Sequence, residues 1–273
     1  MPDARVPSVP RLGLGTWQMG DEPAHRADEI AALRAGLELG FPLIDTAEMY
    51  GSGRAEELVA EAIDGRRDQV FLVTKVLPQN ASARGTVAAC ERSLRRLRTD
   101  RVDLYLLHWP GSHPIVETLA GFEELVRAGK VLRWGVSNFD EEELDAMAGA
   151  GGAACAANQV YYNLAHRGAE SRVMPWCRAH GVVVQAYTPL DQGRLALAAP
   201  VRRVAQRLGV AASAVALAWT VRERGAAAVV KSGREDRVRH LAAALSLRLS
   251  DEDLRHLDAA FPPPKGPAPL ETI

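Results

Sequence analysis

The sequence predicts an α/β fold, a (β/α)8 TIM barrel formed by a single domain that spans residues 1–273. Short apolar runs alternate with helical patterns along the chain, which is typical of βαβ units and a parallel sheet. Eight such units in 273 residues give roughly 30 residues each, the spacing of this barrel. No linker or shift in composition divides the sequence into separate domains.

The expected strands are continuous apolar runs, as parallel strands that are buried on both faces require. In chain order they cover residues 12–16, 43–46, 70–75, 102–108, 131–137, 156–160, 182–187 and 227–231. In a parallel barrel the carboxyl ends of all strands meet at one rim, and barrel enzymes carry out their chemistry there.

Helical patterns lie between these runs. Residues 27–39 and 86–97 each carry one apolar stripe, and residues 213–222 are rich in Ala, Val and Leu. The last helix is expected over residues 251–260, with Ser250 as its N-cap. The proline-rich stretch that follows, FPPPKGPAPLETI, predicts an extended tail.

The rival fold is a doubly wound sheet, which normally carries a glycine-rich fingerprint after its first strand. Here the segment GLGTWQ, which begins at Gly13, lacks the third glycine. The dinucleotide fingerprint is therefore absent, and the barrel is the better prediction.

Composition excludes several classes of function. Lys plus Arg number 33 and Asp plus Glu 34, so no basic excess suggests nucleic acid as a partner. The N-terminus is polar and proline-rich, unlike a signal peptide, and no apolar run approaches membrane-spanning length. Cys90, Cys155 and Cys177 are scattered, an odd count without CxxC spacing. We therefore expect no disulfide framework, no metal site and a cytoplasmic protein.

Polar residues recur where the predicted strands end. They are Asp45 with Tyr50 just beyond, Lys75, His108, Ser137 with Asn138, Gln159, Tyr187, and Lys231 with Ser232. Singly, each has an ordinary structural explanation, such as a turn cap or a packed aromatic ring. Together they would surround one mouth of the barrel, which indicates a functional site.

Four of these residues predict a mechanism. A free tyrosine has a pKa near 10, and a neighbouring lysine ammonium lowers it. A buried lysine needs a carboxylate to stay charged, and Asp45 can supply it. His108 can orient and polarise a carbonyl group. The set makes Tyr50 a candidate general acid for carbonyl reduction.

The sequence resembles the aldo-keto reductase family over nearly the whole chain. The resemblance is carried, in order, by the motifs LGLGTWQMG, LIDTAEMYG, VFLVTKV, VDLYLLHWP, WGVSNF, NQVYYN, AYTPL and VVKSG, with Arg237 following. The two ends of the sequence are similar to a bacterial branch that reduces methylglyoxal and other small aldehydes.

The resemblance implies a catalytic tetrad of Asp45, Tyr50, Lys75 and His108, with Tyr50 as proton donor and NADPH as hydride donor. It also implies a set of cofactor-binding residues along the rim. These are Gly15, Thr16, Trp17 and Asp45; Ser137, Asn138 and Gln159 at the carboxamide; Tyr187 against the nicotinamide; Thr188, Leu190, Gln192, Gly193 and Arg194 over the pyrophosphate; and Lys231, Ser232, Gly233 and Arg237 at the 2′-phosphate.

Two departures from the family pattern concern the adenine end of the cofactor. Val230 stands where many relatives have proline, and His240 and Leu241 stand where relatives often have a Glu-Asn pair. The loop after His108 and the tail are short, so we expect a shallow, open pocket for small aldehydes. The resemblance places the substrate among Trp17, Met49, Tyr50, His108 and Trp109.

Two other functions stay open at this stage. A Schiff-base aldolase would use Lys75 or Lys231 as its nucleophile. An NADPH-sensing regulatory subunit would bind the cofactor and turn over slowly. The resemblance also implies a monomer that acts on a small carbonyl substrate, without nucleic-acid or membrane partners.

Overall fold

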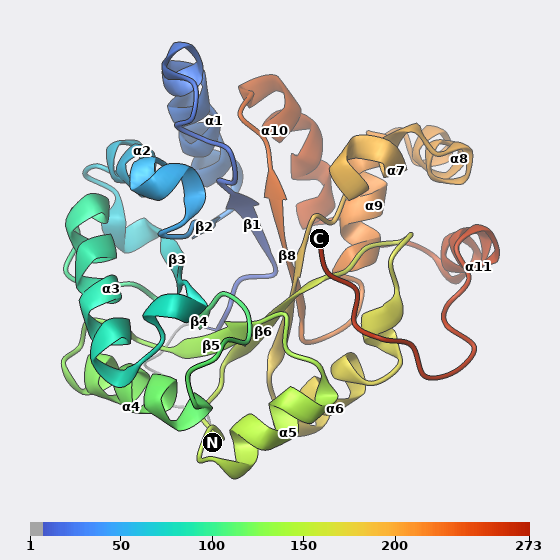
Figure 1. Cartoon of the computed structure of the whole chain (residues 1–273). Helices are drawn as coiled ribbons and strands as arrows, with labels where there is room; N and C mark the ends of the chain where they lie inside the picture. The colour runs from blue at the N-terminus through green and yellow to red at the C-terminus, as the bar shows by residue number, and fades with distance from the viewer. Residues whose placement is uncertain (1–7) are drawn as a thin grey trace.

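The computed structural model describes residues 8–273, so most of the N-terminal stretch MPDARVPSVP lies outside the described residues. Eight parallel strands close into a barrel in the order of the sequence, β1 to β8, and helices surround it (Figure 1). The predicted fold class is confirmed. No helix within residues 8–273 is long and apolar enough to cross a membrane.

The strands follow the predicted runs with small shifts at their ends. They are β1 (Leu12–Gly15), β2 (Leu43–Asp45), β3 (Phe71–Val76), β4 (Leu104–Leu107), β5 (Trp134–Ser137), β6 (Ala157–Tyr161), β7 (Val183–Tyr187) and β8 (Ala226–Lys231). The largest shifts are in β4 and β5. The predicted runs began at Val102 and Val131, which pair with each other as an isolated bridge outside the named strands.

The helices lie outside the barrel and follow the strands in order (Figure 1). They are α1 (Arg26–Leu39), α2 (Arg54–Ala62), α3 (Ala83–Leu97), α4 (Ile115–Arg127), α5 (Glu141–Gly149), α6 (Val173–His180), α7 (Arg194–Leu197), α8 (Ala199–Leu208), α9 (Ala212–Thr220), α10 (Glu235–Leu241) and α11 (Asp251–Ala260). The predicted last helix and its cap are confirmed, because the Ser250 side chain accepts a hydrogen bond from the backbone N–H of Asp253.

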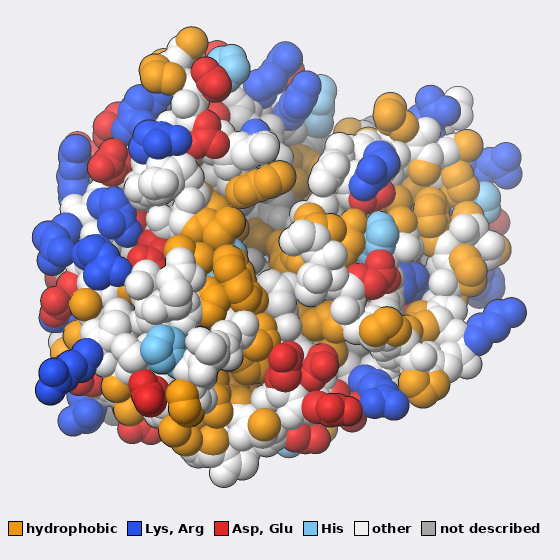
Figure 2. All heavy atoms as spheres, viewed as in Figure 1, with side chains coloured by type: hydrophobic (Ala, Val, Ile, Leu, Met, Phe, Trp, Pro, Cys, Tyr) orange, Lys and Arg blue, Asp and Glu red, His pale blue; other side chains and the backbone are white. Residues whose placement is uncertain are grey.

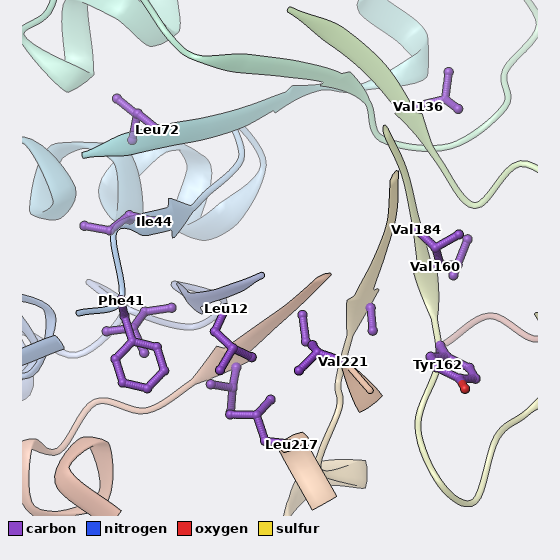
Figure 3. Close-up of a cluster of buried hydrophobic side chains, with 14 of the residues drawn as sticks. Leu12, Phe41, Ile44, Leu72, Val136, Val160, Tyr162, Val184, Leu217 and Val221 are labelled. Carbon is purple, nitrogen blue, oxygen red and sulfur yellow. The ribbon is translucent and has the colours of Figure 1, made fainter. Parts of the chain in front are cut away.

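The outer faces of the strands pack against the helices in one large apolar shell. Figure 3 shows part of it, including Ile44 and Leu72 from neighbouring strands and Leu217 from α9. These side chains are fully buried. The shell takes the residues that alternate with those facing the barrel interior, as the period of a strand requires.

A second, smaller apolar cluster fills the barrel interior. It contains Leu43 of β2, Val73 of β3 and Leu106 of β4. Because side chains two positions apart share one face of a strand, Asp45 follows Leu43 onto the interior face, and Lys75 follows Val73. The interior is thus apolar below and polar at the ends of β2 and β3, which places the candidate site.

Candidate active site

Lys75 connects two other residues of the tetrad, Asp45 and Tyr50. Its Nζ donates to Asp45 Oδ1 at 2.6 Å, to the Thr46 carbonyl at 2.9 Å and to the Tyr50 hydroxyl at 3.4 Å. Lys75 is fully buried and Asp45 is 2% exposed. An ammonium has three protons to donate, and each one here has a partner. The carboxylate, the ammonium and the phenol are therefore held in one fixed unit.

The environment keeps Lys75 charged. Burial acts to lower its pKa, but the charge of Asp45, the Tyr50 phenol and the hydrogen bonds to both outweigh it, and the pKa is raised. The predicted role of Asp45, to compensate a buried ammonium, matches this geometry. A lysine with a raised pKa carries its proton at neutral pH, so Lys75 is poorly suited to act as a Schiff-base nucleophile.

A tight turn brings Tyr50 to the mouth. The turn Tyr50–Gly53 contains three successive residues in the left-handed region, Gly51 at φ 56°, Ser52 at φ 55° and Gly53 at φ 97°. Glycine adopts this conformation without steric cost. A Cβ on Gly53 would also lie 2.5 Å from Arg96 Cδ. The two glycines thus let the loop bend before α2 begins at Arg54.

The acidity of Tyr50 differs from the sequence-based expectation. Lys75 does act to lower its pKa, as predicted, but burial is the larger effect and Asp45 adds to it, so the pKa of Tyr50 is raised. Removing the phenol from water disfavours the phenolate more than one ammonium favours it. Tyr50 is therefore protonated at neutral pH and holds the proton that a general acid must deliver.

His108 lies beside Tyr50 just after β4. The rings of His108 and Tyr50 meet edge to face with their centroids 5.8 Å apart. The ring of Trp109 also packs against His108, with the two centroids 4.8 Å apart. Burial, helped by the charge of Lys75, lowers the pKa of His108 to about 2. His108 is thus a neutral imidazole, which can take part in a hydrogen bond to a carbonyl group but does not supply a charge.

Asp45 is fixed through its second oxygen by Gln159. The Gln159 Nε2 donates to Asp45 Oδ2 at 2.8 Å and to Gln185 Oε1 at 2.6 Å. Gln185, which is fully buried on β7, was not among the predicted site residues. A signal was available, because a polar side chain in an apolar strand two residues before Tyr187 shares its face.

Ser137, Asn138 and Tyr187 form a second hydrogen-bonded group next to this network. Asn138 has φ 62°, and its Nδ2 donates to the His108 carbonyl at 3.1 Å and to Ser137 Oγ at 3.2 Å. The Tyr187 hydroxyl donates to Asn138 Oδ1 at 2.9 Å. The three residues that were predicted for the nicotinamide end, together with Gln159, thus lie together at the ends of β5, β6 and β7.

The residues predicted from the first strand differ in their burial and contacts. The Thr16 hydroxyl is buried and donates to the Asp45 carbonyl at 3.0 Å, so it ties β1 to β2. Trp17 is 47% exposed at the rim. Gly15 pairs in register with Asp45 on one side and Lys231 on the other.

The loop after β7 has a special backbone. Thr188, Asp191 and Gln192 have φ values of 52°, 48° and 54°, and Gly193 has φ 91°. The Arg194 guanidinium is bound to Asp191 Oδ1 at 2.8 Å and Oδ2 at 2.9 Å, so it does not project freely. Leu190 is half-buried against the core.

The residues predicted for a 2′-phosphate lie at the end of β8, in the loop after it and in α10. Lys231 and Arg237 are exposed, whereas Ser232 is buried and donates to the Arg234 carbonyl at 3.2 Å. Gly233 lies against Glu29, whose Cγ would be 3.2 Å from an added Cβ. An exposed ammonium and guanidinium a few residues apart suit a phosphate group.

The geometry of Gly15 fits the predicted nicotinamide cofactor. A Cβ there would come no closer than 3.9 Å to any protein atom, so the protein's own packing does not require glycine at this position. The backbone is also not in the left-handed region. Open space above a glycine between Asp45 and Lys231 permits the close approach of a ligand to the backbone.

Of the substrate residues predicted from the sequence, Tyr50, His108 and Trp109 lie together, and Trp17 and Met49 are in the loops that follow β1 and β2. Met49 is 42% exposed, and Trp109 is half-buried beside His108. Figure 2 shows a hollow at the centre of this face with hydrophobic side chains along its edge. Exposed apolar side chains at a mouth that also holds a polar network are typical of a small-molecule site.

Comparison with known proteins gives a consistent result. The Aldo/keto reductase family model matches residues 11–261. Methylglyoxal reductase YeaE of Escherichia coli (strain K12) is 47% identical over 272 residues, which cover 97% of this chain and 96% of that protein.

Solved structures agree over a similar extent. An aldo-keto reductase from Klebsiella pneumoniae in complex with NADPH matches with a TM-score of 0.94 at 46% identity, covering 97% of this chain and 95% of the other. A Klebsiella pneumoniae aldo/keto reductase in complex with NADP and acetate gives a TM-score of 0.95 at 46% identity, over 97% and 96% of the two chains.

Proposed function

The chain belongs to the aldo/keto reductase family, and from this premise we propose that it reduces small aldehydes and ketones to alcohols with NADPH, 2-oxoaldehydes such as methylglyoxal being the preferred class. One observation carries the proposal, namely that Lys75 Nζ joins the Asp45 carboxylate to the Tyr50 hydroxyl. This is the arrangement that a protonated phenol needs in order to give up its proton in a buried site.

In the proposed reaction Tyr50 delivers its proton to the carbonyl oxygen of the substrate. The phenol then becomes a phenolate, which the ammonium of Lys75 stabilises at 3.4 Å. Asp45 keeps Lys75 charged throughout, and Gln159 keeps Asp45 in place. The neutral His108 orients the substrate carbonyl through its ring.

NADPH, when bound, supplies the hydride that attacks the carbonyl carbon. We propose that Tyr187 packs against the nicotinamide and that Ser137, Asn138 and Gln159 hold its carboxamide. Further proposed contacts are Gly15, Thr16, Trp17 and Asp45 near the nicotinamide, Thr188, Leu190, Gln192, Gly193 and Arg194 over the pyrophosphate, and Lys231, Ser232, Gly233 and Arg237 at the 2′-phosphate.

For the substrate we propose a pocket of Trp17, Met49, Tyr50, His108 and Trp109. The exposure of Trp17 and Met49 supports an open pocket, which favours small carbonyl compounds over large ones. A small substrate gains little binding energy from an open pocket, so an activated carbonyl such as that of a 2-oxoaldehyde is the better match.

The test is to follow NADPH oxidation with methylglyoxal and a panel of simple aldehydes and ketones, with NADH in parallel. We expect turnover with NADPH, and less with NADH if Lys231 and Arg237 bind the 2′-phosphate. The decisive variant is Tyr50→Phe, which should lose about 10²–10⁴-fold in kcat while NADPH binding persists. Wild-type turnover in this variant would refute the role of Tyr50.

The same measurements separate the two alternatives. The raised pKa of Lys75 disfavours the aldolase reading, and borohydride trapping of substrate on a lysine would reverse that judgement. A regulatory subunit would release NADP⁺ slowly enough to limit turnover, so comparing the rate of cofactor release with kcat identifies it.

We also propose that the protein acts as a monomer in a reducing compartment such as the cytoplasm. The resemblance supports the monomer, and the compartment is supported by Cys90, Cys155 and Cys177, which are buried free thiols. Burial raises the pKa of each thiol to about 12, which fits small core residues without redox chemistry. Size-exclusion chromatography with light scattering tests the oligomeric state.

A further inference from the structure

The segment that follows α11, residues 262–273, returns across the barrel and ends near its centre (Figure 1). It is docked on the loop between β6 and α6. Ser171 Oγ donates to the Ala268 carbonyl at 3.0 Å, and the Ala268 N–H donates to Ser171 Oγ at 3.1 Å. The Pro269 carbonyl lies so close to Gly168 that an added Cβ would be 2.5 Å from it.

A contact between two side chains completes this docking. Glu271 Oε2 lies 2.5 Å from His166 Nδ1, with the two side chains 42% and 30% exposed. The His166 backbone is itself held, because Asn163 Oδ1 accepts hydrogen bonds from the N–H groups of Ala165 and His166 at 2.9 and 3.1 Å. The segment is thus attached to a rigid support.

His166 is the outer ring of an aromatic stack that leads to the site. Its ring lies 4.5 Å from the ring of Tyr161 at an interplanar angle of 30°. Tyr161 in turn stacks on Tyr187, with centroids 5.6 Å apart and an angle of 16°. The Tyr161 hydroxyl donates to Asp191 Oδ1 at 3.2 Å, which anchors the middle of the stack to the loop after β7.

The segment also reaches the inner end of the stack. Burial raises the pKa of the Tyr187 hydroxyl to about 12, and the nearby backbone N–H of Ile273 acts in the opposite direction. The hydroxyl itself donates to Asn138 Oδ1 at 2.9 Å. Glu271 thus contacts the outer ring of the stack, and Ile273 lies near the inner one.

We propose that His166 and Glu271 are positioning residues for the cofactor, because their contact holds residues 262–273 against the Tyr161–Tyr187 stack and so sets the position of the Tyr187 ring. This rests on the proposed function, in which Tyr187 packs against the nicotinamide. Neither residue touches the reacting atoms. Their contact keeps the Tyr187 ring in place before NADPH binds, and this preorganisation raises the affinity for the nicotinamide.

The test uses variants that break the contact and keep the stack. Glu271→Ala removes the carboxylate, and His166→Phe removes the ring nitrogen while keeping an aromatic ring against Tyr161. For a partly exposed pair we expect the Kd of NADPH, measured by fluorescence titration, to rise roughly three- to tenfold in each variant. Glu271→Gln, which can still accept a hydrogen bond, should recover part of the loss.

Two comparisons separate positioning from a general loss of structure. The double variant should bind NADPH no more weakly than His166→Phe alone, because that change already removes the contact with Glu271, together with the 3.8 Å approach of His166 Nε2 to Asp191 Oδ1. Glu91→Ala is the matched control. It removes an ion pair to Lys130 of the same 2.5 Å length and similar exposure, 41% and 37%, between α3 and the end of α4. It should leave the Kd of NADPH unchanged.

Proteolysis measures the docking of residues 262–273 separately from cofactor binding. Lys265 is exposed in the docked segment, and we expect trypsin to cleave after it several-fold faster in Glu271→Ala than in the wild type, as detected by mass spectrometry. Faster cleavage with an unchanged Kd of NADPH would overturn the positioning role, and unchanged cleavage would overturn the docking role. Failure of the wild type to bind NADPH would refute the proposed function itself. This outcome does not depend on the cleavage result, so the two failures can be distinguished.

Discussion

Two ion pairs, one fully buried and one partly buried, lie at opposite ends of β3 and have different roles. Lys75 and Asp45 join β3 to β2 where the strands end, 2.6 Å apart. Arg67 and Asp103 join the segments that precede β3 and β4, 2.8 Å apart. The first pair is 0% and 3% exposed, and the second 18% and 10%.

The difference between the two pairs lies in their third partner. Lys75 donates a hydrogen bond to the Tyr50 hydroxyl, a group that can lose its own proton. Arg67 donates its other hydrogen bonds to the carbonyls of Val70 and Arg101 and to the Thr99 hydroxyl. None of these partners titrates in the physiological range. A buried ion pair therefore becomes part of a reaction only when it is coupled to a group that exchanges protons.

The largest effect on stability is expected when Lys75 is replaced. Lys75→Met leaves Asp45 buried without its ammonium, which should lower the free energy of unfolding by about 3–5 kcal/mol. It should also reduce kcat by about 10²–10⁴-fold, since the Tyr50 phenolate loses its stabilising charge. Urea denaturation and NADPH oxidation measure the two losses. If the variant does not fold, Lys75→Arg keeps the charge with altered geometry and should fold with reduced kcat.

A smaller effect, confined to stability, is expected at the other end of β3. Asp103→Ala removes the acceptor for Arg67 and for the Leu72 backbone N–H, at a cost of about 2 kcal/mol. The catalytic network is not touched, so kcat should stay within about twofold of the wild type under conditions where the protein is folded. A large loss of kcat would show that the two ends of the barrel are coupled.

The pH dependence of stability sharpens the comparison further. The folded pKa of His108, about 2, is below its ordinary value of 6.5, so the unfolded chain binds a proton at higher pH than the folded protein does. This contribution to stability is present above the ordinary value and is lost as pH falls. Between pH 6.5 and pH 5 the loss should be about 1.5 kcal/mol.

The matched variant for this measurement is His108→Gln, which cannot titrate in that range. The free energy of unfolding, determined by urea denaturation at several pH values, should fall less steeply with acid in the variant. Equal slopes in the two proteins would contradict the neutral, buried state of His108.

The smallest effect on stability is expected at Gly15. Gly15→Ala meets no protein atom closer than 3.9 Å, so the free energy of unfolding should change by less than about 0.5 kcal/mol. If the cofactor approaches this backbone, the Kd of NADPH should nevertheless rise. Gly13→Ala is the control lower on the same strand, because its Cβ would lie 2.4 Å from Leu43 Cδ2 and should destabilise the fold. An unchanged Kd of NADPH in Gly15→Ala would remove Gly15 from the cofactor site.

The sequence predicts the parts of the site that depend on strand direction. Asp45 and Lys75 could be placed together because parallel strands end at one rim and alternate residues share a face. The pKa of Tyr50 could not be predicted, because the balance between burial and the charge of Lys75 depends on how completely the turn covers the phenol.

The sequence did not predict contacts between distant segments. Residues 262–273 were expected to be extended, and their docking on the loop after β6 depends on partners such as Glu271 and His166, far apart in the chain. Gln185 was missed for a related reason. Its importance comes from its hydrogen bond to Gln159 on the neighbouring strand, and neither residue is adjacent to Asp45 in the sequence.

The strands of the closed barrel follow one another in the order of the chain. The residues proposed for proton donation and many of those proposed for cofactor binding therefore occupy different parts of the sequence. Tyr50, Lys75 and His108 come from consecutive strands or the loops after them in the first half, whereas four of the proposed nicotinamide contacts, Ser137, Asn138, Gln159 and Tyr187, follow in the second. If Met49 and Trp109 line the substrate pocket as proposed, changing them should alter the substrate range while these four contacts are left intact. A chimaera joined between β4 and β5 would exchange the proposed proton-donating residues for those of a relative and keep the four contacts.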